Sequence, residues 1–128
     1  MLGRKSVHVS VIVPTWNECN NVGPLLDRIH QALSSQDHEV IVVDDSSPDG
    51  TAHAVEDYIR RYPNLRTLLL SRPCKKGLSG AVLDGAALAQ GDYLVMMDAD
   101  LSHDPTVIPQ MLTKLDSGYD VVVGSRYT

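Results

Sequence analysis

The segment EVIVVDDSSPDGT, residues 39–51, decides the fold. Its first half, Glu39–Asp45, is an apolar, β-branched run that predicts a buried strand. In its second half Asp49 and Thr51 open a predicted helix that extends to about Tyr62. A strand that passes through a polar turn into a helix is one unit of an alternating α/β pattern.

The same alternation runs along the whole chain. The pattern predicts four other strands, over Val7–Thr15, Leu65–Ser71, Asp92–Asp98 and Tyr119–Ser125. It predicts three other helices, over Asn21–Leu33, Ser79–Gln90 and Pro105–Leu115. Because the strands are continuous apolar runs, we expect both faces of the sheet to be covered. The sequence therefore predicts an α/β fold: one domain over residues 1–128, with a mostly parallel sheet and helices on both faces.

Composition limits the classes of function. The 128 residues carry 43% hydrophobic and 21% charged side chains and a net charge of −5, which is typical of a globular domain without the basic surface of a nucleic-acid binder. The apolar runs are too short to span a bilayer, and no signal peptide is predicted. Cys19 and Cys74 are expected to be free thiols. We therefore expect a cytoplasmic protein.

Polar residues follow every predicted strand, and parallel sheets bind ligands beyond the carboxyl ends of their strands. The triplet Asp98-Ala99-Asp100 places two carboxylates at one such end. Carboxylate oxygens suit Mg²⁺ or Mn²⁺ held jointly with substrate phosphates. The alternative is that Asp100 caps a turn and Asp98 is a solvated strand end, since two aspartates at this spacing are common by chance.

Other strand ends carry candidate binding residues with structural alternatives. Asp45 is expected to hydrogen-bond a ribose or a base, whereas Asp49 or Thr51 caps the next helix. The ring of Trp16 either stacks on a base or anchors the core. Glu18 either binds a ribose hydroxyl or caps the helix that follows it.

Basic residues are few. Arg72, Lys75 and Lys76 form a cluster that either meets diphosphate oxygens or lies in a solvated loop, and Arg126 follows the last predicted strand. The histidines have no spacing typical of metal ligands, so we expect surface or hydrogen-bonded, partly buried groups; only His103 lies beside the aspartate pair.

Five segments in this order resemble the dolichol-phosphate (polyprenyl-phosphate) mannosyltransferases. The segments are VIVPTWNE at 11–18, VDDSSPDGT at 43–51, KKGLSGAVLDG at 75–85, MDADLSHDP at 97–105 and GSRY at 124–127. Those enzymes are family 2 inverting glycosyltransferases of GT-A fold. The resemblance implies a GDP-mannose donor, a polyprenyl-phosphate acceptor and a Mg²⁺ or Mn²⁺ cofactor. It also implies that the chain is the donor-binding part, without the family's C-terminal acceptor part.

The resemblance also assigns site residues. The nucleoside pocket would be lined by Pro14, Trp16, Glu18, Val43 and Asp45. The metal and the diphosphate would be held by Asp98, Ala99 and Asp100, with Arg126 on the diphosphate and Lys76 near the donor. This sequence departs from the family at Trp16, where tyrosine is commoner, and at Ser102, where some relatives have a glutamine that binds the metal.

Two other functions remain open on the sequence alone. One is a family 2 transferase with another donor, such as UDP-glucose. The other is a non-catalytic nucleotide-binding or receiver-like signalling domain, although in receiver domains the acidic pair follows the first strand, where this chain has Pro14-Thr15-Trp16.

Overall fold

The computed structural model describes residues 7–73, 78–97, 99 and 105–110. The elements are β1 Val7–Thr15, α1 Val22–Ala32, β2 His38–Asp44, α2 Thr51–Arg61, β3 Thr67–Ser71, α3 Leu78–Leu88, β4 Gly91–Met96 and a short 3₁₀ helix η1, Pro105–Val107. Seven of them match predicted elements to within about two residues. Residues 108–110 continue η1 as α-helix, so the described part of the predicted 105–115 helix is helical. The predicted strand over 119–125 lies outside the described residues.

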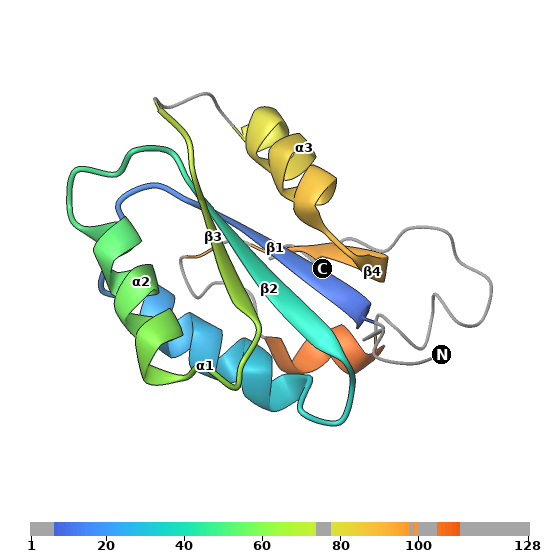
Figure 1. Ribbon diagram of the computed structural model, residues 1–128. Coiled ribbons are helices and arrows are strands. Elements are labelled where there is room, and N and C mark those ends of the chain that lie inside the picture. The colour runs from blue at the N-terminus through green and yellow to red at the C-terminus, as the bar shows by residue number, and fades with distance from the viewer. Residues whose placement is uncertain (1–6, 74–77, 98, 100–104, 111–128) are drawn as a thin grey trace.

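The sheet has the strand order β3-β2-β1-β4, and its three pairings are all parallel. The chain moves outward from β1 to β3 and then returns through α3 to place β4 on the other side of β1 (Figure 1). This reversal makes the carboxyl ends of β1 and β4 the point at which the loops diverge, where open α/β sheets bind ligands.

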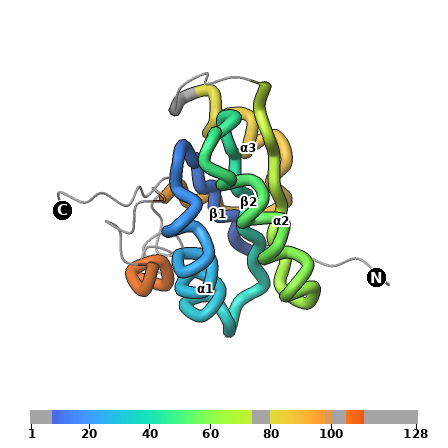
Figure 2. The backbone as a smooth tube through the Cα atoms, turned by 90° about the vertical axis from the view of Figure 1, so that its left-hand side faces the viewer, coloured from blue at the N-terminus to red at the C-terminus, as the bar shows by residue number. Residues whose placement is uncertain are grey.

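Helices cover both faces of the sheet, as the sequence predicts. On one face α1 and α2 pack over Val9, Val11 and Val13 of β1, and residues 105–110 lie beside α1 (Figure 2). On the other face α3 packs over Ile12 of β1 and Ile41 of β2. Helix α3 approaches the sheet closely at Gly85, where a Cβ atom would lie 2.8 Å from Ile12 Cγ2.

A buried acid ties the strands together on the α3 face. Glu39 of β2 is fully buried, and its carboxylate accepts hydrogen bonds from Ser10 Oγ at 2.6 Å, Arg66 Nε at 3.0 Å and Gln90 N at 2.7 Å. Gly91 N donates in turn to Ser10 Oγ at 2.9 Å. A buried charge is stable only when it is paired and hydrogen-bonded, and here one carboxylate bonds to residues on both sides of β2.

The loops that follow β1 and β2 are joined to each other. Three consecutive backbone N–H groups of the β1–α1 loop donate to three side chains of the β2–α2 loop. The pairs are Asn17 N to Ser47 Oγ at 2.9 Å, Glu18 N to Thr51 Oγ1 at 3.0 Å and Cys19 N to Asp49 Oδ2 at 3.1 Å. The N-cap residue of α2 is Gly50, at φ 91°, and not Asp49 or Thr51 as predicted. Asp49 Oδ1 nevertheless accepts from Thr51 N, the first N–H of the helix, at 3.0 Å.

Two histidines meet on the α1–α2 face. His30 of α1 and His38 of β2 share a hydrogen bond of 2.8 Å between Nδ1 and Nε2, and His30 Nε2 lies 2.9 Å from Thr67 Oγ1. The ring of His30 stacks on Tyr58 of α2, whose hydroxyl donates to Asp27 at 2.7 Å. Burial, and then the electrostatic effect of His38, lowers the pKa of His30 to about 4. Both histidines are hydrogen-bonded, as expected, but their mutual contact was not predicted.

We expect the stability of the protein to fall between pH 6.5 and pH 4 because of His30. In the unfolded chain the imidazole binds a proton below about pH 6.5, whereas in the folded chain it stays neutral down to about pH 4. Above pH 6.5 His30 takes nothing from the free energy of unfolding. By pH 4 it has lowered that free energy by about 3 kcal/mol. Urea unfolding across this range should show a shallower pH dependence for His30→Gln than for the wild type. The exposed His53→Gln is the control, and an unchanged slope for His30→Gln would contradict the assignment.

Loss of the Asp49 carboxylate should loosen both loops. Asp49→Ala removes the acceptor of Cys19 N and of Thr51 N, while Trp16, the sole tryptophan, reports on the adjoining loop. We expect the fluorescence emission of Trp16 to move to longer wavelength and its quenching by acrylamide to increase. Asp57→Ala changes an exposed aspartate of α2 that pairs with Arg60, and it should leave the emission unchanged. Equal spectra for the two variants would show that Asp49 does not hold this edge together.

Candidate functional site

The candidate site lies at the carboxyl edge of the sheet, where Thr15, Asp44 and Ser71 align across β1, β2 and β3. Met97 N donates to Ile12 O at 3.0 Å, which fixes the end of β4 beside β1. Because all four strands point the same way, the residues that follow them meet along one rim. Two of these residues have left-handed backbones, Asn17 at φ 57° and Ser46 at φ 59°, a conformation that non-glycine residues adopt rarely.

The two neighbouring aspartates at the end of β2 have different partners. Asp44 accepts from Thr15 Oγ1 at 2.8 Å, from Ser47 N at 3.0 Å and from Ser47 Oγ at 2.6 Å. It is 1% exposed and joins the end of β1 to the β2–α2 loop. Asp45 comes next, and its backbone N donates to Thr15 O at 3.3 Å. Its carboxylate pairs with Arg72 and not with Thr15 or Ser47, the partners of Asp44.

Asp45 forms a two-point ion pair with Arg72, the residue after β3. Arg72 Nε donates to Asp45 Oδ1 at 2.5 Å and Arg72 Nη2 donates to Asp45 Oδ2 at 3.1 Å. Arg72 Nη1 donates to Asp84 Oδ2 of α3 at 3.0 Å. The hydrogen bond to Asp45, and then that to Asp84, raises the pKa of Arg72. A guanidinium between two carboxylates is fully charged and fixed in orientation.

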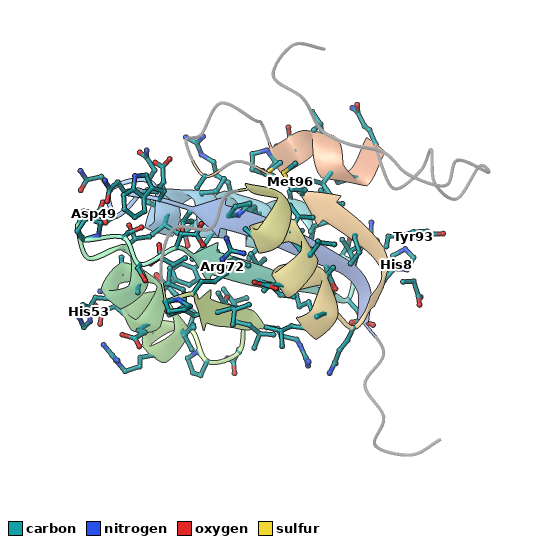
Figure 3. All side chains as sticks on the ribbon, turned by 90° about the horizontal axis from the view of Figure 1, so that it is seen from above. His8, Asp49, His53, Arg72, Tyr93 and Met96 are labelled. Atoms are coloured by element: carbon teal, nitrogen blue, oxygen red, sulfur yellow. The ribbon has the colours of Figure 1, made fainter. Side chains whose placement is uncertain are left out.

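Arg72 is therefore not the solvated loop residue that one interpretation of the basic cluster predicted. The residue is 3% exposed. Figure 3 shows it among the side chains in the middle of the molecule, whereas Asp49 and His53 lie at the left-hand edge of the view. The solvated-loop interpretation failed because the partners, Asp45 and Asp84, come from two other elements and cannot be identified from the residues next to Arg72.

Trp16 lies at the edge and not in the core. It is 39% exposed directly after β1, so the core-anchor interpretation is wrong. Pro14 beside it is half-buried. Glu18, also half-buried, accepts a hydrogen bond from Asn21 Nδ2 at 3.0 Å, and its backbone carbonyl accepts from Val22 N. The carboxylate of Glu18 thus holds the side chain that precedes α1 and does not cap the helix backbone itself.

Two assigned residues belong to the core by their side chains. Val43 is fully buried in the cluster beneath α3. Ala99, after β4, is 3% exposed and packs in the cluster on the α1 face. The remaining residues that the sequence assigns to the site lie outside the described residues: Lys76, Asp98, Asp100, Ser102 and Arg126. Within the described ranges no group of three or more His, Cys, Asp or Glu side chains could hold a metal ion.

Sequence reasoning missed the role of Asp84. A lone acidic residue in the apolar helix LSGAVLDGAAL was the available signal, since α3 otherwise packs on the sheet through small and aliphatic side chains.

In the part of the chain that the structure describes, no helix has the length and apolar character that a membrane crossing requires.

Known proteins share this fold and sequence. A dolichol-phosphate mannosyltransferase from Pyrococcus furiosus is 44% identical over 119 residues, which cover 93% of this chain and 33% of that protein. One from Mycosarcoma maydis is 38% identical over 124 residues, covering 92% of this chain and 42% of the relative. The chain thus spans less than half the length of either relative.

Solved structures agree on the GT-A fold. The mannosyltransferase PcManGT from Pyrobaculum calidifontis, in complex with GDP-Man and Mn²⁺, matches with a TM-score of 0.69 and 34% identity over 75% of this chain and 28% of that one. Residues 1–349 of S. aureus TarS, in complex with UDP-GlcNAc, match with a TM-score of 0.65 and 27% identity over 87% of this chain and 32% of that one.

These similarities confirm the family to which the sequence motifs pointed and leave no ground for a receiver-like signalling domain. The profile of the family described as glycosyl transferase family 2 matches residues 10–128. The parallel sheet and its reversal at β1 agree with this match. This chain belongs to glycosyl transferase family 2.

Proposed function

We propose that the chain is the donor-binding part of an inverting glycosyltransferase that moves mannose from GDP-mannose to a polyprenyl phosphate. The observation that carries this proposal is the 44% identity to a dolichol-phosphate mannosyltransferase over 93% of the chain. The similarity to a mannosyltransferase solved with GDP-Man and Mn²⁺ supports the choice of donor and of cofactor.

The nucleoside would bind along the rim between β1 and β2. The partly exposed ring of Trp16 offers a face on which a base can stack. The Asp45 carboxylate can accept N–H groups from the edge of that base. Pro14 would border the pocket, and Glu18 would accept a ribose hydroxyl with the acceptor positions that Asn21 leaves open. Val43 is fully buried, so its side chain would support the pocket from below.

The diphosphate would bind near the end of β4. Asp98 and Asp100 would hold a divalent cation, since two carboxylates are the hard oxygen ligands that Mg²⁺ and Mn²⁺ prefer. The cation would neutralise the diphosphate and stabilise it as a leaving group. Arg126 would pair with the diphosphate, and Lys76 would add a second positive charge near the donor. Buried Ala99, between the two aspartates, would anchor this segment to the core.

The acceptor explains why no strong base is required. A phosphate monoester has a second pKa of about 6, so it is largely a dianion at pH 7 and attacks without losing a proton to the protein. The work of the chain is then to position the donor and neutralise the charge of the leaving GDP. A polyprenyl acceptor would place the reaction at a membrane surface, and a cytosolic protein would act there peripherally.

A uridine-diphosphate donor is the second candidate. It is favoured by the similarity to TarS, which was solved with UDP-GlcNAc at 27% identity. The two donors differ in the base, so competition between GDP and UDP separates the candidates.

We expect GDP to bind the chain in a metal-dependent manner. Titration calorimetry with Mn²⁺ should give a measurable heat for GDP and a weaker affinity for UDP, and both should disappear with EDTA. Tighter binding of UDP would favour the second candidate. A flat titration of the folded chain with both nucleotides would reject the proposed function.

Asp100→Ala should abolish the metal-dependent part of GDP binding, and turnover in a full-length enzyme, because one of two cation ligands is lost. Asp92→Ala is the matched control, since Asp92 is an exposed aspartate near the other end of β4, 81% exposed at its side chain. Near-normal Mn²⁺-dependent binding by Asp100→Ala would reject the metal role of Asp100.

A further inference from the structure

The side chains of Ser47, Asp49 and Thr51 hold the loop between β1 and α1, and we call these three residues the clasp. Ser47 and Asp49 lie in the loop after β2, and Thr51 is the first residue of α2. The clasp accepts the backbone N–H groups of three consecutive residues, 17, 18 and 19, at 2.9, 3.0 and 3.1 Å. The bonded residues are 30 to 33 positions apart along the chain, so the clasp joins two separate loops of the rim.

The clasp stabilises a loop conformation that extended or helical chains do not adopt. Asn17 has a left-handed backbone, φ 57°, which is rare for a residue other than glycine. Ser47, which accepts the N–H group of Asn17, is itself held by Asp44: its N–H and hydroxyl groups donate to that carboxylate at 3.0 and 2.6 Å. The Thr51 hydroxyl donates to Asp49 Oδ1. Both hydroxyl groups of the clasp thus accept one hydrogen bond and donate another without any ligand.

Glu18 is the residue that these bonds fix most completely. Its N–H group donates to Thr51 Oγ1, and its carbonyl oxygen accepts from Asn21 N at 3.0 Å and from Val22 N at 2.9 Å. In its half-buried side chain, Oε1 accepts from Asn21 Nδ2 at 3.0 Å. Oε2 accepts no hydrogen bond from the residues that the structure describes. One carboxylate oxygen is therefore occupied, and the other keeps its capacity to accept a hydroxyl group.

Thr51 is the member of the clasp that acts directly on Glu18. It is fully buried at the start of α2, so the packing of that helix fixes its backbone. Asp49 orients its hydroxyl, because Asp49 Oδ1 accepts from Thr51 N at 3.0 Å and from Thr51 Oγ1 as well. With its proton directed at Asp49, the hydroxyl oxygen is left to accept from Glu18 N.

We infer that Thr51, oriented by Asp49, is a positioning residue for recognition of the ribose. Its hydroxyl fixes the backbone of Glu18, and the fixed backbone directs the Glu18 carboxylate toward a ribose hydroxyl. This inference rests on the proposed place of Glu18 in the nucleoside pocket. It adds that the ribose preference of the site depends on a fully buried residue of α2.

The test compares two nucleotides that differ only in the ribose. GDP has both ribose hydroxyl groups and 2′,3′-dideoxy-GDP has neither, so the ratio of their affinities in the presence of Mn²⁺ measures the ribose preference. Thr51→Val keeps the shape of the side chain and removes its hydroxyl. We expect the affinity for GDP to fall about fivefold, and the ribose preference to fall equally, since one hydrogen bond that holds Glu18 is lost. Binding of 2′,3′-dideoxy-GDP and of Mn²⁺-pyrophosphate should be unchanged.

Three further variants control for a loss of stability. Thr51→Ser retains the hydroxyl, so it should bind GDP with the ribose preference of the wild type. Thr67→Val is the matched control, because Thr67 is a buried threonine at the start of β3 whose Oγ1 lies 2.9 Å from His30 Nε2. It should lower the free energy of unfolding and bind all three ligands like the wild type. In a Glu18→Ala background, Thr51→Val should cause no further loss of ribose preference, because Thr51 acts only through Glu18.

The outcomes separate this inference from the proposed function. If Glu18→Ala loses the ribose preference but Thr51→Val keeps it, the clasp only stabilises the loop and the inference is wrong. The inference is also wrong if Thr51→Ser binds as weakly as Thr51→Val, or if Thr51→Val weakens the binding of Mn²⁺-pyrophosphate as much as that of GDP.

Two other results reach the proposed function. If the wild type has no ribose preference, or Glu18→Ala keeps it, the proposed role of Glu18 fails and the inference fails with it, while metal-dependent GDP binding still supports the donor. If the wild type binds neither GDP nor UDP, the proposed function itself is rejected.

Discussion

Parallel pairing of β1 on both of its edges is the constraint on which the rest of the structure depends. β1 hydrogen-bonds to β2 on one side and to β4 on the other, and its residues from Val9 to Val13 are buried on both faces. The strand must therefore be apolar at successive positions, with Ser10 tolerated because it donates to Glu39. Since its two neighbours run parallel to it, the residues after β1, β2 and β4 arrive at the same rim.

At this rim the adjacent residues Asp44 and Asp45 have different partners. Asp44 and Asp45 are identical side chains in adjacent positions, yet Asp44 is occupied by hydroxyl and amide donors of the neighbouring loops. Asp45 is held by the guanidinium of Arg72. Alternation along the extended chain accounts for the difference, because successive side chains point to opposite faces and so meet different partners.

Much of the fold could be predicted because its signals are local. Apolar runs such as Val40–Val43 and the helical spacing of Leu25, Leu26 and Ile29 depend on neighbouring residues alone. The exposed place of Trp16 and the pairing of Arg72 could not be predicted in this way. Each depends on what other elements bring to the same point in space, and Asp84 is twelve residues from Arg72 along the chain.

The histidine pair illustrates the same limit. His30 and His38 are on different elements, and only the packing of α1 against β2 brings their rings together. The five motifs, in contrast, identified the family because their order along the chain is itself specific information. The positions of Asp98, Asp100 and Arg126 remain predictions from those motifs.

Two acids near the ends of β2 and two arginines beside β3 have matching spacing. Glu39 and Asp45 are six positions apart, and so are Arg66 and Arg72, and each acid pairs with the arginine at its own end. The two ion pairs therefore fix the register of β3 against β2. Sliding β3 by one position would separate both pairs at once and turn its side chains to the wrong face. Opposite charges thus exclude a misaligned sheet that an all-aliphatic pair of strands would tolerate.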